Sequence, residues 1–434
     1  MPLQLLSLLG ILTILGLCFL LSRDRKSVRW RTILTALGIQ FGLGLLLLGW
    51  DPGSEALFWF GGQVKDFLDL SKQGSEFVFG SLATNPALAV QGGEEGSSSY
   101  VQVGFIFATA VLPIIIFFSS VMSIAYHLGI MQRLVGVMAK VMARALGTSG
   151  AESMSACGNI FVGQTEAPLL VKPFLPTMTR SELHAVMTGG FATIAGSVFG
   201  LYVGFGIDPG LLVVASVMAV PAGIACSKLL EPETEQADTM GRVDVHIEKT
   251  ASNVVEAAAN GASDGLKLAL NVAAMLVAFL GLVGVIDWIF EAGANGYWLI
   301  LSGGDEMAPE GYAPTLESIL GSILAPFAWL LGVPWAESEA VGSLLGKKLV
   351  VTELFAFKDL GEMQKANELS DRSIRIASFA LCGFANVGSV AIQVGGLSSI
   401  APDRKADLAG IGFRAMFAGA LATCMTGALA GLLT

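Results

Sequence analysis

Long stretches without charge dominate the hydrophobic pattern of this chain of 434 residues. A helix needs about 20 apolar residues to cross the roughly 30 Å hydrocarbon core of a bilayer. Eight stretches of the sequence have about this length: 3–22, 32–50, 101–126, 183–207, 210–227, 268–286, 376–402 and 415–434. The pattern therefore predicts an all-α integral membrane protein with eight transmembrane helices.

The chain also contains an internal repeat. The sequence LGTSGAES at 146–153 is followed by a Thr-Glu pair at 165–166, and LGVPWAES at 331–338 is followed by another pair at 352–353. Further along, GFATIAGSV in the first half is matched by GFANVGSV in the second. These agreements predict three parts: 1–126 with three N-terminal crossings that are partly scaffold, 127–267 with the first repeat, and 268–434 with the sixth helix and the second repeat.

Each half contains an interrupted hydrophobic segment. In the first half, Gly163 loosens the helix, Thr165 can cap a new one with its hydroxyl, and Pro168 fits the first turn of that new helix. Inside a bilayer, a broken helix is tolerated only where protein covers it or where it lines a cavity. We therefore predict one re-entrant hairpin over about 150–173 and a second over about 336–356. Such paired interruptions are typical of secondary transporters.

Basic residues predict the orientation of the chain. Lys and Arg concentrate in cytoplasmic loops, and five of them lie between residues 23 and 31, which places the N-terminus outside. Three crossings between the hairpins then put the first hairpin inside and the second outside, as an inverted repeat. In the alternative, the apolar stretch 318–336 crosses as well. We interpret it as the counterpart of 131–147, a helix at the surface of the bundle.

The composition agrees with this class of protein and limits its function. Of all residues 53% are hydrophobic and 14% are charged, and the mean hydropathy is +0.69. The net charge of -10 argues against a nucleic-acid partner. The five cysteines lie apart in apolar segments, and the sequence has no phosphate loop, nucleophile motif or zinc signature. These features disfavour an enzyme, although a membrane-embedded enzyme using Glu166 and Glu353 as acid and base is an alternative.

Two glutamates stand out in this apolar chain. A charge near the bilayer centre costs roughly 2.5 to 3.5 kcal/mol on insertion scales, so we predict that Glu166 and Glu353 are functional. Asn386 and Ser389 are three residues apart and share a helical face, which favours a role in one site. The pattern alone does not favour a functional role at three further positions. At Asn159 a structural role explains the residue equally well, and Val198 and Phe384 fit ordinary packing.

The most specific signals are three segments: GNIFVGQTEAPLLVKPFL, GGFATIAGSV and LCGFANVGSVAIQVGG. They resemble the concentrative nucleoside transporter family, of the sodium-coupled bacterial type, and the resemblance covers nearly the whole chain. It implies a homotrimeric, elevator-type transporter of a bacterial inner membrane. Each protomer would hold a scaffold and a mobile transport domain, which is built from two re-entrant hairpins and two partly unwound helices. No enzymatic cofactor is implied, and sodium would be the coupling ion.

The resemblance also assigns a site for a uridine-like nucleoside. The implied contacts of the nucleobase are Gln164, Thr165, Glu166 and, packed against it, Val198. The implied contacts of the ribose are Glu353, Asn386 and Ser389, with Phe384 nearby. The implied sodium ligands are the side chains of Asn159 and Thr193 and the carbonyls of Val162 and Ile194. Amides and carboxylates suit the mixed donors and acceptors of a base edge and the donating hydroxyls of a ribose.

Two positions depart from the pattern of the family. Thr352 stands before Glu353 where Asn is common, and Gly388 stands before Ser389 where Ser is frequent. Both departures bear on the ribose end or on selectivity. The coupling ion has an alternative as well, because Glu166 or Glu353 could carry a proton if desolvated, which would give a proton-coupled nucleoside symporter.

Overall fold

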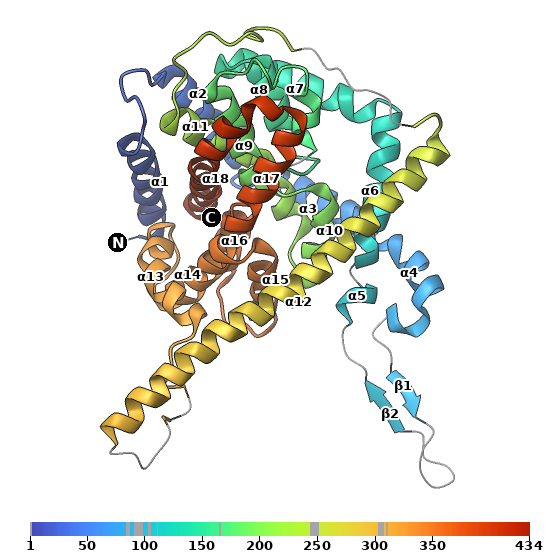
Figure 1. The fold of residues 1–434 in the computed structure, drawn as a ribbon, viewed down its shortest axis with the longest axis vertical. Coiled ribbons are helices and arrows are strands. Elements are labelled where there is room, and N and C mark those ends of the chain that lie inside the picture. Colours follow the sequence, from blue (N-terminus) through green and yellow to red (C-terminus); the bar gives the residue numbers. More distant parts are fainter. Residues whose placement is uncertain are drawn as a thin grey trace.

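The computed structural model describes residues 2–83, 87–90, 99–102, 106–110, 112–164, 166–243, 251–302, 308–309 and 311–434, with the backbone alone for 87–90, 99–102 and 197. These residues are mainly helical (Figure 1). The helices of the N-terminal part are α1 (Leu3–Leu20), α2 (Trp30–Leu47), α3 (Asp51–Asp69), α4 (Ser71–Phe79), η1 (Gly80–Ala83), α5 (Phe107–Ala110) and α6 (Leu112–His127). Strands β1 (Ala87–Val90) and β2 (Ser99–Gln102) pair antiparallel, a small departure from the all-α prediction, and the predicted span 101–126 starts later because β2 occupies 99–102.

The order of elements after α6 occurs twice. The first series is α7 (Ile130–Leu146), α8 (Gly150–Gly158), η2 (Ala167–Val171), α9 (Arg180–Ala192), α10 (Gly196–Phe205) and α11 (Pro209–Leu230). The second is α13 (Leu316–Leu330), α14 (Trp335–Val350), α15 (Glu353–Lys365), α16 (Asp371–Leu381), α17 (Val387–Ile400) and, after η3 (Pro402–Arg404), α18 (Lys405–Leu433). Between the two series lies α12 (Val254–Leu301).

Six segments of the described chain are long and apolar enough to cross a membrane: α1, α2, Phe107–His127, α11, α12 and Pro402–Leu433. The prediction of a multi-pass membrane protein is thus supported, but two of the eight predicted crossings are not continuous helices. The stretch 183–207 is broken into α9 and α10, and 376–402 is broken into α16 and α17. Unwound backbone therefore occurs at 193–195 and 382–386, once in each half.

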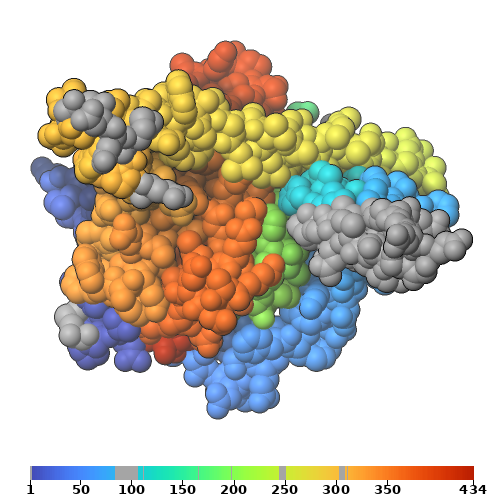
Figure 2. Space-filling model, turned by 90° about the horizontal axis from the view of Figure 1, so that it is seen from below, coloured from blue at the N-terminus to red at the C-terminus, as the bar shows by residue number. Residues whose placement is uncertain are grey.

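The helix α12 is much longer than the predicted span 268–286. Its N-cap residue Asn253 accepts a hydrogen bond from the backbone N of Glu256 at 2.9 Å, and the helix then continues for 48 residues. The sequence suggested a connector with a surface helix over 231–265, whereas residues 254–265 belong to α12 itself. No proline falls between 254 and 301, so nothing removes a backbone donor from the helix. Figure 1 shows α12 crossing the molecule obliquely, and Figure 2 shows its uncovered outer face.

The helix α12 packs closely on α6 through small residues. A Cβ on Gly261 would lie 2.6 Å from the carbonyl oxygen of Ser119, and one on Gly265 would lie 2.8 Å from the Cα of Ile116. Glycines four residues apart allow two membrane helices to bring their backbones into contact. These two helices therefore form a close pair at one side of the molecule.

The predicted range of the second hairpin, 336–356, covers most of α14 and the start of α15, and the chain turns between these helices at Val351 and Thr352. The apolar stretch 318–336, whose role the sequence left open, covers all but the first two residues of α13. This helix has 15 residues, and the chain bends by 116° between it and α14. A helix of this length is too short to cross a core of roughly 30 Å by itself.

The centre of the fold is formed by α11 and α18. Their most apolar windows are 89% and 78% buried inside the molecule, against 6% for α12 and 28% for α1 and α2. The broken helix α9–α10 packs on this centre from one half and α16–α17 from the other. The two breaks are thus held between buried helices and not at the surface.

Candidate functional site

The two helix breaks touch each other inside the fold. The backbone N of Phe384, in the second break, donates a hydrogen bond to the carbonyl of Thr193 in the first, at 3.3 Å. A Cβ on Gly383 would lie only 2.5 Å from the carbonyl oxygen of Phe191, so this approach requires glycine. Unwound backbone from both halves therefore meets at one place, which is where binding groups of broken-helix transporters are found.

The predicted ribose residues form a connected polar cluster. Glu353 is 3% exposed and accepts hydrogen bonds from Asn386 Nδ2 at 3.1 Å and from Thr352 Oγ1 at 3.0 Å. Asn386 is the N-cap of α17, and its Oδ1 accepts from the backbone N of Ser389 at 2.7 Å. A chain of hydrogen bonds therefore links three of the predicted residues, Glu353, Asn386 and Ser389. The fourth, Phe384, is half-buried in the adjoining break.

The charge of Glu353 is balanced by its surroundings. It is the first residue of α15, so its carboxylate lies at the positive end of the helix dipole. Tyr202, which lies on α10 and stacks on Phe357 at 4.3 Å, donates its hydroxyl to Glu353 Oε1 at 3.0 Å. The buried Lys348 interacts electrostatically with Glu353 while its ammonium donates to the carbonyl of Ala380 at 2.8 Å and to Thr423. Hydrogen bonds and a nearby cation make this buried carboxylate tolerable.

Gln164 and Glu166, two of the predicted nucleobase residues, lie between α8 and η2, where the first hairpin is predicted. The arm α8 ends at Gly158, and the other arm is η2, a short 3-10 helix with Pro168 in its first turn, as predicted. The N-cap of η2 is Glu166 and not Thr165, which lies outside the described residues. Gln164 is 7% exposed, whereas Glu166 is exposed and accepts a hydrogen bond from Gly163 N at 2.8 Å.

The two ends of the predicted site are not joined by a hydrogen bond between described residues. Glu166 interacts electrostatically with Tyr126 of α6 and with Asp264 of α12, so it lies near the close pair of helices described above. Val198 is buried in the first turn of α10. The structure thus brings Glu353, Asn386 and Ser389 together and places Gln164 and Glu166 on a neighbouring element.

The predicted sodium residues present oxygen atoms in one region. Asn159 is fully buried and donates through Nδ2 to the carbonyl of Ser155 at 2.9 Å, while its Oδ1 has no partner among the described residues. Asn159 packs against Gly189 of α9, where a Cβ would lie 3.2 Å from Asn159 Nδ2. The hydroxyl of Thr193 bonds to the carbonyl of the same Gly189 at 2.9 Å.

The other two predicted ligands are backbone carbonyls. Within the described chain, no residue donates a hydrogen bond to the carbonyl of Val162 or to that of Ile194. Amide, hydroxyl and carbonyl oxygens are the ligands that hard cations prefer.

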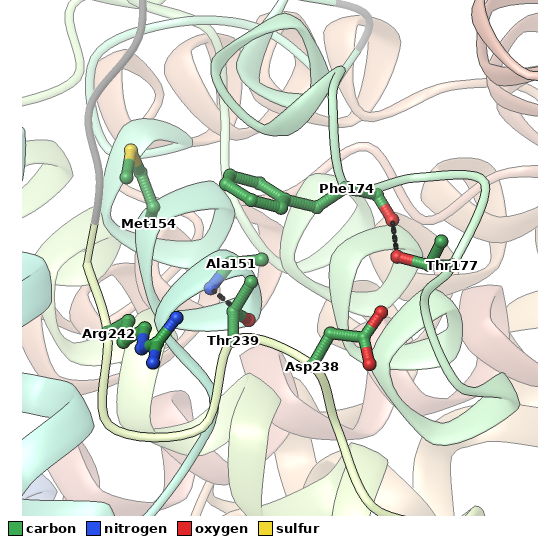
Figure 3. Close-up of a pocket in the computed structure, with 7 residues that line it drawn as sticks. All are labelled: Ala151, Met154, Phe174, Thr177, Asp238, Thr239 and Arg242. Carbon is green, nitrogen blue, oxygen red and sulfur yellow. Dashed lines mark hydrogen bonds between the residues drawn. The ribbon is translucent and has the colours of Figure 1, made fainter.

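A cavity of about 230 Å³ lies elsewhere, at the base of the first hairpin (Figure 3). Its lining residues are Ala151, Met154, Phe174, Thr177, Asp238, Thr239 and Arg242. Thr239 holds the start of α8 there, because its carbonyl accepts from Gly150 N at 3.0 Å and its hydroxyl from Ala151 N at 3.2 Å. The cavity contains none of the predicted site residues, so we do not assign the substrate to it.

Sequence reasoning missed two residues of the site region. Tyr202, the hydroxyl donor to Glu353, follows Val198 by four residues, and Gln393, a buried amide, follows Ser389 by four. Residues four apart lie on one face of a helix. Each is a polar group in an apolar run, one turn beyond a candidate, and this spacing was the signal that could have identified them.

The chain was compared with known families and structures. Residues 211–431 match the family described as Na+ dependent nucleoside transporter C-terminus, residues 9–82 match the corresponding N-terminus, and residues 108–208 match a nucleoside recognition Gate family. An uncharacterized transporter of Haemophilus influenzae is 43% identical over 98% of this chain and 97% of its own length. Sodium/nucleoside cotransporter 1 of Homo sapiens is 41% identical over the whole chain, which spans 64% of the human protein.

Solved structures agree with these matches. The transporter CNTnw in an inward-facing substrate-bound state is 42% identical, with a TM-score of 0.88 over 99% of both chains. A variant of CNTnw in an outward-facing state gives the same TM-score over 99% of this chain and 98% of that chain. The proteins with an assigned activity in these comparisons are transporters and not enzymes, which removes the membrane-enzyme alternative. The chain belongs to the concentrative, sodium-dependent nucleoside transporter family.

Proposed function

We propose that the protein is a sodium-coupled nucleoside symporter of a bacterial inner membrane. The observation that carries this proposal is the buried cluster of Glu353, Asn386 and Ser389 at the contact of the two helix breaks. Hydroxyls of a ribose donate hydrogen bonds, and this cluster offers carboxylate and amide acceptors to them. The names of the relatives support both the nucleoside and the sodium.

The nucleobase binds at the first hairpin in this proposal. Gln164 and Thr165 would supply amide and hydroxyl groups and Glu166 a carboxylate, while Val198 would pack against the flat face of the base. Phe384 would pack near the ribose. Glu353 and Glu166 come from different hairpins, so a nucleoside bound to both would join the two halves of the protein.

Sodium binds beside the base end and is transported with the nucleoside. Its ligands would be the side chains of Asn159 and Thr193 and the carbonyls of Val162 and Ile194. Asn159 and Gln164 lie on the same hairpin, so an ion that fixes this turn also orders the base-binding groups. Because binding linkage is reciprocal, sodium then raises nucleoside affinity and nucleoside raises sodium affinity by the same factor.

The transport movement is an elevator of one part of the chain against another. Both hairpins and both broken helices would move with the substrate, while α6 and α12 would belong to the scaffold, and three copies would form the transporter. The N-terminus would lie outside and the two halves would be inverted. The similarity to one transporter in inward-facing and outward-facing states supports two end states.

A thermal-unfolding panel of the purified protein tests the substrate and ion together. Nucleosides, free bases and sugars would be added in sodium chloride or in choline chloride at equal ionic strength. A ligand that binds the folded state raises the unfolding midpoint. We expect a nucleoside to do so in sodium and to do so less in choline. Stabilisation by free bases or sugars alone, with none by nucleosides, would contradict the proposal.

A further inference from the structure

Gln393 is a buried amide whose hydrogen bonds are incomplete. It lies on α17, one turn after Ser389, and is fully buried. Its Nε2 donates to the carbonyl of Met187 on α9 at 3.1 Å, which fixes the orientation of the amide. Its Oε1 is then left without a partner among the described residues. A donor is expected to reach this oxygen, because a buried acceptor without a hydrogen bond is unfavourable.

The neighbouring amide is Gln164 at the tip of the first hairpin. Gly190 on α9 lies between them, since a Cβ there would be 2.2 Å from Gln393 Nε2 and 2.8 Å from Gln164 Cβ. Gln164 Oε1 is also buried and without a partner among the described residues. A half turn of the Gln164 amide exchanges the positions of its oxygen and nitrogen, and the two orientations fill the same space. The turn replaces a pair of unpaired acceptors, Gln164 Oε1 and Gln393 Oε1, by a donor, Gln164 Nε2, and an acceptor, Gln393 Oε1.

We propose that Gln393 is a residue that positions Gln164 for the nucleobase. Gln393 Oε1 accepts a hydrogen bond from Gln164 Nε2, and this bond turns Gln164 Oε1 toward the base. This inference rests on the proposed nucleoside site and specifies its chemistry. A carbonyl oxygen facing the base requires an N–H donor on the base edge. Uracil supplies such a donor at N3, and cytosine and adenine supply one through their exocyclic amines.

Binding of three nucleoside probes to the purified full chain in saturating sodium tests the inference. The probes are cytidine, its analogue with pyrimidin-2-one as base, which lacks the exocyclic amine, and 2′-deoxycytidine, which lacks a ribose hydroxyl. In the wild type, loss of the amine should weaken binding by about tenfold or more, the cost of an unpaired buried acceptor. In Gln393→Met, that penalty should fall to within about threefold, while the penalty for the missing hydroxyl stays as in the wild type.

The control is Gln40→Met. Gln40 is another buried membrane glutamine, whose Nε2 donates to Thr426 Oγ1 at 3.1 Å between α2 and α18, away from the hairpin tip. It should keep both penalties of the wild type. A folded Gln393→Met with the wild-type penalty for the missing amine would overturn the inference. If that variant does not fold, Gln393→Asn, whose side chain is one methylene shorter, takes its place. A reduced penalty for the missing amine is then expected, and a wild-type penalty would overturn the inference.

A double variant separates positioning from simple packing. In the proposal, Gln393 acts through Gln164. The loss of affinity on removing the amine from the probe should therefore be the same in the double variant, Gln164→Met with Gln393→Met, as in Gln164→Met alone. Independent effects of the two substitutions would contradict the inference. A wild type that binds nucleosides without any penalty for the missing amine overturns this inference alone, whereas a wild type that binds no nucleoside overturns the proposed function as well.

Discussion

At the scale of single residues, the protein keeps one carboxylate in an apolar interior by giving it several partners. Glu353 has Tyr202, Asn386 and Thr352 as donors and Lys348 as a nearby cation. Asn159 shows the opposite condition, because its Oδ1 is buried without a partner among the described residues. The first arrangement suits a ligand that replaces existing donors with ribose hydroxyls, and the second suits a ligand that supplies a positive charge.

The substitution Glu353→Gln should weaken nucleoside binding by about 10- to 100-fold. It removes the charge from the acceptor of the ribose hydroxyls, and hydrogen bonds to charged groups contribute about 1.5 to 3 kcal/mol. Titration calorimetry of uridine in sodium measures the effect. Glu339→Gln is the control, since Glu339 is exposed on α14 of the same hairpin. Wild-type affinity in a folded Glu353→Gln would refute the assignment of this carboxylate to the ribose.

The substitution Asn159→Ala should abolish the stabilisation of the protein by sodium. In the wild type, sodium binding to the folded state raises the unfolding midpoint relative to choline. Without the amide oxygen, this difference should disappear. The control Asn253→Ala removes the N-cap of α12 and should cost about 0.5 to 2 kcal/mol of stability, yet keep the response to sodium. An unchanged sodium response in Asn159→Ala would show that the ion binds elsewhere.

At the scale of elements, the contact between the two helix breaks organises the site. Gly383 allows the second break to lie on the backbone of Phe191 and Ala192. The substitution Gly383→Ala should therefore push α16–α17 away from α9–α10 and weaken sodium and nucleoside binding together. Gly395→Ala, in open space on α17, should leave both unchanged. Binding of both ligands at wild-type affinity by Gly383→Ala would mean that the breaks do not need this contact.

The sequence predicted elements where the signal was local. Gly163 and Pro168 predicted a break before a new helix, where η2 begins, and the second Thr-Glu pair coincides with the start of α15. The length of α12 was missed, because Glu256 and Asp264 made its first turns resemble a polar connector although nothing there stops a helix. The full length of α15 was not predicted either, since this helix carries charged residues that hydropathy alone assigns to a loop.

The site residues divide in the same way. Glu353, Asn386 and Ser389 were predicted from their charge, their spacing and the family resemblance. Tyr202 and Gln393 were not predicted, because only their spacing from a candidate residue marked them and their contacts are with residues far away in sequence. Gln393 reaches Met187 on another broken helix, and only packing at Gly190 brings it to Gln164.

At the scale of the whole molecule, the arrangement separates a buried centre from an exposed periphery. The helices α11 and α18 are surrounded by protein, while α12 exposes most of its apolar surface (Figure 2). In a bilayer that surface meets lipid or further copies of the chain. The candidate site lies near the centre, and in the movement that we propose a nucleoside bound there would pass the pair of α6 and α12.

In the mechanism that we propose, a sodium gradient drives nucleoside accumulation. A moving sodium ion gains about 2.3 kcal/mol per 100 mV of membrane potential, which is sufficient to concentrate a neutral solute. The direct measurement is uptake of labelled uridine by proteoliposomes under an inward sodium gradient, with an uncoupler present to collapse any proton gradient. We predict accumulation above the external concentration. Accumulation driven by a proton gradient in sodium-free medium, with none driven by sodium, would contradict the account and establish proton coupling instead.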